Sequence, residues 1–152
     1  MTTSEPVLAA GIISALKHFV TVTKLHPILV NFTAALVPVS VASDILGRVC
    51  KMDSLRNTGW WTLFYAIILT PFTAITGWLF WMKDDNGAAG MTIHKWLGTS
   101  LAVLLFVLFA WRWNLRKRQV WSTPAYLFLG FVFVVALVYQ GYLGGQQVFS
   151  GM

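Results

Sequence analysis

The chain has 152 residues, of which 57% are hydrophobic and 11% are charged, and its net charge is +6. Soluble domains are about half apolar and about a quarter charged, so this composition favours a membrane protein whose apolar segments face lipid. The basic residues lie mainly between the apolar segments, where such residues set topology, which argues against nucleic-acid binding. Cys50 is the only cysteine, which excludes an intrachain disulfide and cysteine-based metal motifs.

The first apolar stretch, at about residues 5–23, contains VLAAGIISALKHFVTV, in which polar residues are sparse. It predicts a short helix that lies in the outer membrane interface, with His18 as an interfacial residue. A half-inserted fifth segment is the alternative. The stretch lacks the basic start of a cleaved signal peptide, so we expect it to be retained.

Four longer apolar segments follow, at about residues 26–46, 60–81, 92–113 and 124–142. Each has about 20 residues, which as a helix reach about 30 Å and cross the hydrocarbon layer. Helices are expected because backbone groups in lipid must be satisfied within the segment. All eight tryptophans fall near the ends of these segments, as in an aromatic belt. The sequence therefore predicts an all-α, up-down four-helix membrane bundle with an N-terminal interfacial helix, in a single domain over residues 1–152.

The positions of the basic residues predict the orientation of this bundle. Seven of them lie at the end of the third span or in the connections after the first and third spans, and four lie on the opposite side. The seven are Arg48, Lys51, Arg56, Arg112, Arg116, Lys117 and Arg118, and the four are Lys17, Lys24, Lys83 and Lys95. Because basic residues are retained in the cytoplasm, both termini are expected to face outward.

Two of the three histidines open membrane spans. His26 begins the first span and His94 begins the third, and these spans run parallel in an up-down bundle. If the helices are arranged sequentially, the two spans are diagonal and their histidines can meet across the core near the outer face. At about 100° per residue, His26 shares a helix stripe with Thr33, Ser40 and Asp44, and such a polar stripe is expected to point away from lipid.

The same spacing occurs in both of these spans. Asp44 lies 18 residues after His26, and Arg112 lies 18 residues after His94. This spacing is about five helical turns, so the registry that aligns the histidines also aligns Asp44 with Arg112. A structural ion pair between these two residues is expected, and a proton path is the alternative.

The pair of histidines predicts a haem site. Two neutral imidazoles on facing helices are a common arrangement for the axial ligands of low-spin haem b. His26 and His94 are the candidate ligands, and Gly98, one turn after His94, leaves room for a porphyrin. The alternatives are that the histidines only tolerate the polar interface and that the glycine serves close packing. Lys24, Lys83 and Lys95 are candidates to pair with the haem propionates. A second metal hypothesis is a copper(I) site formed by Met82, Met91, His18, His26 and His94.

Five pieces of the sequence occur in the order typical of one membrane protein family. They are HPILVNFTAAL at 26–36, ASDIL at 42–46, TAITGWLFW at 73–81, the lone His94, and GYLGGQQVF at 141–149. The chain resembles a widespread family of four-helix bacterial membrane proteins whose first helix begins H-P-x-x-V-H-F-P-I-A-L. The family has a second histidine at the position of Asn31 and a proline at that of Thr33, and it commonly has a further C-terminal histidine. A second haem or a multi-histidine metal site is therefore not expected here.

The resemblance implies a redox role in the bacterial cytoplasmic (inner) membrane, because family members often occur beside or fused to Rieske proteins and c-type cytochromes. We therefore expect a small cytochrome-b-like electron-transfer subunit that connects a quinol or a membrane redox partner to a protein at the outer face. It is not expected to be an enzyme alone, since the sequence has no Ser/His/Asp set, phosphate loop or paired catalytic carboxylates. The alternative is a cofactor-free scaffold or assembly subunit of a larger complex.

Overall fold

The computed structural model describes residues 4–80, 89–120 and 122–149. These residues form the helices α1 (Ser4–Val22), α2 (Leu25–Val49), α3 (Asp53–Phe80), α4 (Ala89–Lys117) and α5 (Pro124–Phe149), and no strand occurs among them. The all-α fold predicted from the sequence is confirmed. The four helices after α1 are each long and apolar enough to cross a membrane.

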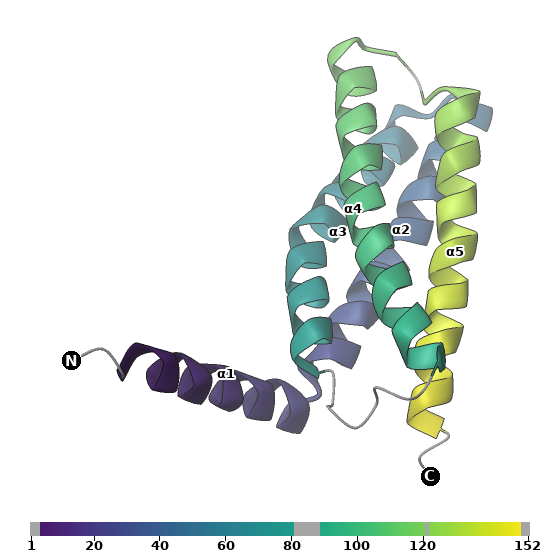
Figure 1. Ribbon diagram of the computed structural model, residues 1–152. Coiled ribbons are helices and arrows are strands. Elements are labelled where there is room, and N and C mark those ends of the chain that lie inside the picture. The colour runs from purple at the N-terminus through teal and green to yellow at the C-terminus, as the bar shows by residue number, and fades with distance from the viewer. Residues whose placement is uncertain (1–3, 81–88, 121, 150–152) are drawn as a thin grey trace.

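Helices α2 to α5 stand side by side as an up-down bundle, and α1 extends sideways from one end of it (Figure 1). The turn between α1 and α2 depends on Lys24, whose backbone is left-handed with φ 50°. The near end of α1 packs against α2 and α3. This direction is compatible with the interfacial helix predicted from the sequence, and the position of α1 in the membrane stays a prediction.

The order of the helices around the bundle is sequential. Helix α2 packs against α3 and α5, and α4 packs against the same two helices, so α2 and α4 are diagonal. The α2–α3 contact is the most extensive of these. It is close because Gly59 brings the two backbones together and the Ser40 hydroxyl donates a 2.7 Å hydrogen bond to the Gly59 carbonyl. Small residues that allow such an approach are typical of helix packing in membranes.

The middle of the bundle is an apolar core to which all four spanning helices contribute. Its buried members are Val37, Leu63, Ala66, Ile67, Leu101, Leu105 and Phe133. On α2 the stripe of Thr33, Ser40 and Asp44 is also buried, so its polar side chains face inward. Large apolar side chains such as Phe72, Val103 and Phe128 are exposed on the outside, where lipid can cover them.

The close approach at Gly59 generates a testable prediction. A Cβ atom at this position would lie 2.8 Å from Asp44 Oδ1 and 3.0 Å from the Ser40 carbonyl oxygen. Gly59→Ala should therefore destabilise the protein by about 1–3 kcal/mol through overpacking. Thermal unfolding in detergent measures the effect.

Gly141→Ala is the matched control, because a Cβ atom at Gly141 would meet nothing within 4 Å. It replaces a helical glycine in open space, so it should raise the melting temperature or leave it unchanged. Equal melting temperatures for the two variants would contradict the proposed α2–α3 packing.

Candidate functional site

His26 is held against α3 through one ring nitrogen. Its Nδ1 lies 3.1 Å from the Thr73 carbonyl oxygen and 3.4 Å from the Thr76 hydroxyl. The ring rests on Gly77, where a Cβ atom would lie only 2.8 Å from His26 Cε1. A carbonyl oxygen can only accept, so the hydrogen bond to Thr73 places the proton on Nδ1. In the neutral ring, Nε2 therefore keeps its lone pair.

His94 is held against α5 in the same way. Its Nδ1 lies 3.2 Å from the Gln140 carbonyl oxygen, and a Cβ atom at Gly144 would lie 2.8 Å from His94 Cε1. The Gln140 amide nitrogen donates to the His94 carbonyl oxygen at 2.8 Å and lies 3.4 Å from His94 Nε2. The contact of Nδ1 with a carbonyl oxygen and that of Nε2 with an amide nitrogen both agree with a ring whose proton is on Nδ1 and whose Nε2 is an acceptor.

The same arrangement of a histidine, a carbonyl and a glycine therefore occurs in both helical hairpins. In each, a histidine near the start of the first helix donates to a carbonyl of the second helix, and the ring lies on the glycine four residues after that carbonyl. The pairs are Thr73 with Gly77 and Gln140 with Gly144. The hairpins α2–α3 and α4–α5 thus position their histidines equivalently at one end of the bundle.

His26 and His94 lie at the same end of diagonal helices but are not in contact. Each hydrogen bonds to its neighbouring helix, and among the described residues no hydrogen bond or ring contact joins the two imidazoles. The space that Gly98 leaves is taken by Gln140, because a Cβ atom at Gly98 would lie 2.7 Å from the Gln140 amide nitrogen. The Gln140 amide oxygen is buried and has no hydrogen-bond partner among the described residues.

Asp44 and Arg112 meet across the diagonal at the other end of the bundle. The pair is bidentate, with Arg112 Nη2 2.7 Å from Asp44 Oδ1 and Arg112 Nε 2.9 Å from Asp44 Oδ2. The Arg112 side chain is 2% exposed and the Asp44 side chain is 0% exposed. Two parallel charge-assisted hydrogen bonds are the strong form of this interaction. Burial of either charge without the other is strongly unfavourable, so the pair ties α2 to α4.

Two parts of this site were not predicted from the sequence. The carbonyl acceptors on α3 and α5 depend on how the helices pack, and the sequence carries no direct signal for them. Gln140 does carry a signal, because it is a polar residue within the apolar run FVFVVALVYQGY. A polar residue inside a membrane span is a candidate functional residue by its position alone.

Some candidates of the copper(I) and propionate hypotheses lie outside the described residues, namely Met82 and Lys83. The described residues contain no group of three or more histidine, cysteine, aspartate or glutamate side chains able to hold a metal ion. The copper(I) site and the role of Lys83 stay predictions. Lys95 is described, and its Nζ lies 3.8 Å from the centroid of the Trp78 ring.

These features define a multi-pass helical membrane protein with a paired histidine layer at one end and a buried ion pair at the other. The chain belongs to the family described as predicted membrane protein (DUF2231), whose profile matches residues 23–151. The resemblance to a membrane protein family is thus confirmed, whereas the association with Rieske proteins and cytochromes stays a prediction. No curated protein and no solved structure matches the chain.

The buried ion pair generates a second prediction. Asp44→Leu or Arg112→Leu alone should destabilise the protein by about 3–5 kcal/mol, because each leaves a buried charge without its partner. The double variant, which removes both charges, should recover much of this loss. The stabilities are measured by unfolding in detergent as a double-mutant cycle.

Asp53→Leu is a suitable control, because Asp53 forms an exposed ion pair with Arg56 at 3.0 Å. Its loss should cost less than about 1 kcal/mol. If the effects of the two core substitutions simply add, Asp44 and Arg112 do not interact as described.

Proposed function

We propose that this protein is a small electron-transfer subunit of the membrane that holds one haem b between His26 and His94. The observation that carries the proposal is the short contact of each imidazole Nδ1 with a backbone carbonyl oxygen, from which the tautomer is assigned. Each donates from Nδ1 to a backbone carbonyl, so each keeps an unprotonated Nε2. The two residues lie at the same end of diagonal helices.

This arrangement suits axial ligation of iron. Metal-binding histidines commonly donate their second ring N–H to a carbonyl, which fixes the ring and makes the other nitrogen a better ligand. Haem with two axial imidazoles supplies reversible one-electron transfer. The residues of this chain supply the rest: Thr73 and Gln140 orient the rings, and Gly77 and Gly144 give them room.

Gln140 is the residue that must move for a porphyrin to lie beside Gly98. Its amide group occupies that space but is the far end of a flexible side chain. The amide oxygen is buried without a partner, which is an unfavourable state for a polar atom. Displacement of the Gln140 side chain would therefore break only the contacts of its amide nitrogen with His94.

The surroundings of the histidines also fit the proposal. Lys24 and Lys95 lie within two residues of His26 and His94, respectively, where they supply positive charge for haem propionates. Electrons would pass between a quinol or a redox partner in the membrane and a protein at the face that carries the histidines. The family resemblance, with its frequent neighbours among Rieske proteins and c-type cytochromes, supports such a partner.

A specific observation favours a second candidate, a cofactor-free scaffold or assembly subunit. Both imidazoles are already packed on glycines and hydrogen bonded to carbonyls by the chain alone. In this alternative, the histidines fasten each hairpin, and the protein supports a larger membrane complex through its exposed apolar helices.

An absorption spectrum distinguishes the two candidates. Protein purified from cells supplied with a haem precursor should show an α-band in the dithionite-reduced minus oxidised spectrum. His26→Ala and His94→Ala should each abolish the band, because each removes one axial ligand. His18→Ala is the control and should retain it, since His18 is exposed on α1. Absence of the band in the unaltered protein would favour the scaffold. Retention of the band in both the His26→Ala and His94→Ala variants would show that the ligand assignment is wrong.

The glycines beneath the imidazoles allow a finer test. Gly77→Ala and Gly144→Ala each place a methyl group where the histidine ring now lies, so the ring must shift. Both variants should lose haem or change its midpoint potential while circular dichroism shows unchanged helix content. Gly141→Ala, in open space on the same helix as Gly144, should behave as the unaltered protein. An unchanged spectrum and potential in the Gly77 and Gly144 variants would mean that the observed ring positions are not those used for ligation.

A further inference from the structure

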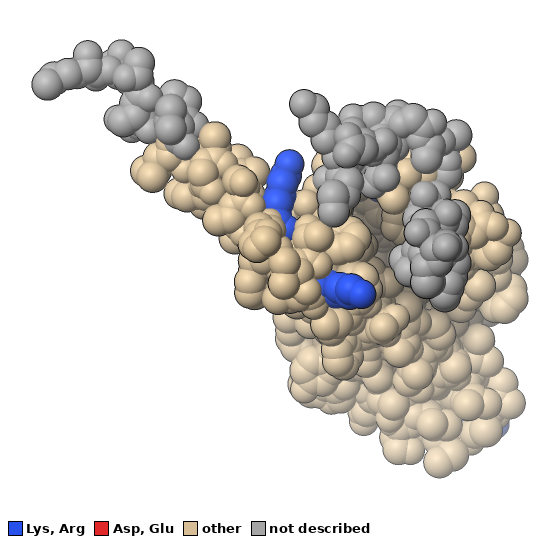
Figure 2. All heavy atoms as spheres, turned by 90° about the horizontal axis from the view of Figure 1, so that it is seen from below, with Lys and Arg blue, Asp and Glu red and all other residues tan. Residues whose placement is uncertain are grey.

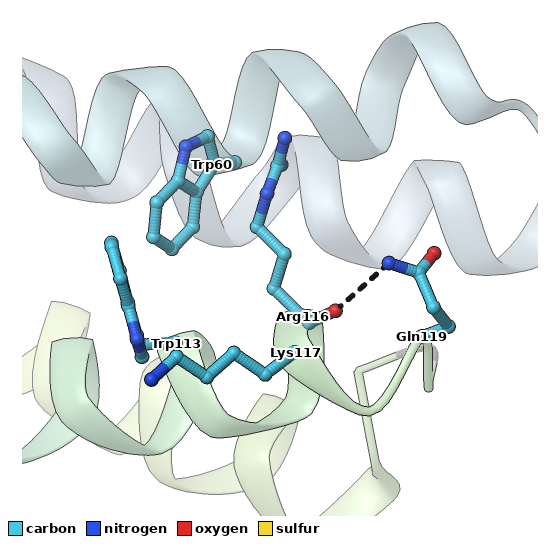
Figure 3. A pocket seen from close by; sticks show the side chains of 5 residues that line it. All are labelled: Trp60, Trp113, Arg116, Lys117 and Gln119. Carbon is cyan, nitrogen blue, oxygen red and sulfur yellow. Dashed lines mark hydrogen bonds between the residues drawn. The ribbon is translucent and has the colours of Figure 1, made fainter.

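The end of the bundle opposite the histidines contains a pocket of about 290 Å³ between α3 and α4. It is lined by Trp60, Trp113, Arg116, Lys117 and Gln119. Figure 3 shows the Arg116 side chain extending toward Trp60 and the Lys117 side chain extending toward Trp113, with Gln119 at the edge. The pocket therefore combines two cationic side chains with two indole rings.

Among the described residues, the two cations in this pocket have no acidic partner. The Arg116 guanidinium lies 4.7 Å from the Trp60 ring centroid, and Lys117 Nζ lies 5.4 Å from the Trp113 ring centroid. Neither has an ion pair in the described part of the chain, and the Arg116 guanidinium has one long hydrogen bond there, of 3.4 Å, to the Asn57 amide oxygen.

The acids described at this end are already engaged. Asp44 is bound to Arg112, and Asp53 is bound to Arg56. An anion that enters the pocket therefore meets two cations whose charge no carboxylate of the described residues neutralises. The guanidinium and ammonium groups are the usual protein partners of phosphate oxygens.

Beneath the pocket, an aromatic surface continues toward the middle of the membrane. The Trp60 ring lies 5.4 Å from both the Phe109 and Trp113 rings and 6.4 Å from Phe64. Trp60 was expected in the aromatic belt at the membrane interface, and it is only 5% exposed because these neighbours and Arg116 cover it. Its burial places an apolar, aromatic wall directly next to the two cations.

We propose that this pocket binds the phosphate headgroup of an anionic phospholipid, such as phosphatidylglycerol or cardiolipin, with an acyl chain along the aromatic surface of α3 and α4. Basic pockets between membrane helices at headgroup depth are typical sites for such lipids. The indole rings favour a lipid over free phosphate, because tryptophan in membrane proteins is enriched at the lipid interface. The site is independent of haem binding.

The opposite end of the bundle provides a contrast. Seen from below, the end that carries the histidines shows isolated basic side chains on an otherwise uncharged surface of described residues (Figure 2). At that end a single lysine, Lys95, lies over the Trp78 and Trp96 rings, whereas the α3–α4 pocket is lined by two cationic side chains.

Lipid binding is measured by native mass spectrometry and thermal unfolding of the full chain in detergent. Phosphatidylglycerol should bind at least about tenfold more tightly than phosphatidylcholine with the same acyl chains. Inorganic phosphate at the same concentration should give little stabilisation. Equal effects of the two lipids would overturn the proposal, and equal stabilisation by inorganic phosphate would identify the ligand as free phosphate and not lipid.

Matched variants locate the site. The double variant R116Q/K117Q should lose most of the preference for phosphatidylglycerol, and Lys117→Gln alone should lose part of it without disturbing any hydrogen bond of a described side chain. The control K51Q/R118Q removes the same charge from the same end but outside the pocket, and should keep the preference. An equal loss in the control would show that binding depends on diffuse charge and would contradict a defined site.

Discussion

The ion pair between Asp44 and Arg112 constrains the whole arrangement of this protein. Neither charge can be buried in a bilayer without the other, and the two residues belong to helices that are diagonal in the bundle. Their pairing fixes α2 and α4 in both registry and rotation. Five helical turns away, the same registry places His26 and His94 at one depth. The ion pair thus determines which residues of α2 and α4 face the core.

The buried charged groups and the two core-facing imidazoles of the described residues lie in two layers separated by mainly apolar packing. One layer holds the ion pair, and the other holds the two histidines with Gln140. Between them lies the cluster around Val37 and Leu105. In the histidine layer, both hairpins apply the same combination of a carbonyl acceptor and a glycine. This equivalence explains how a chain without an evident sequence repeat can present two similarly oriented imidazoles.

The sequence predicted the parts of the structure that depend on helical periodicity. The four long helices, the inward stripe on α2 and the proximity of Asp44 to Arg112 all follow from spacing along single helices, combined with the cost of exposing charge to lipid. The description of the chain as a member of a membrane protein family also followed from short motifs.

Features that depend on contacts between helices could not be read from the sequence. Whether an imidazole turns toward its diagonal partner or toward a neighbouring carbonyl is decided by side-chain packing, and here both turn toward the neighbour. Likewise, Gly98 was expected to leave room for a porphyrin, but Gln140 from α5 lies beside it. Trp60 lies near the end of a span as the belt pattern requires, yet the rotation of α3 against α4 buries its ring.

The central claim of this account is that His26 and His94 ligate the same iron through their Nε2 atoms. Low-temperature electron paramagnetic resonance of the oxidised protein tests it most directly, because the spin state of ferric haem reports its axial ligands. The account predicts a low-spin signal in the unaltered protein that is lost or becomes high-spin when either histidine is replaced. A high-spin signal in the unaltered protein, or no haem signal after expression with a haem precursor, would contradict it.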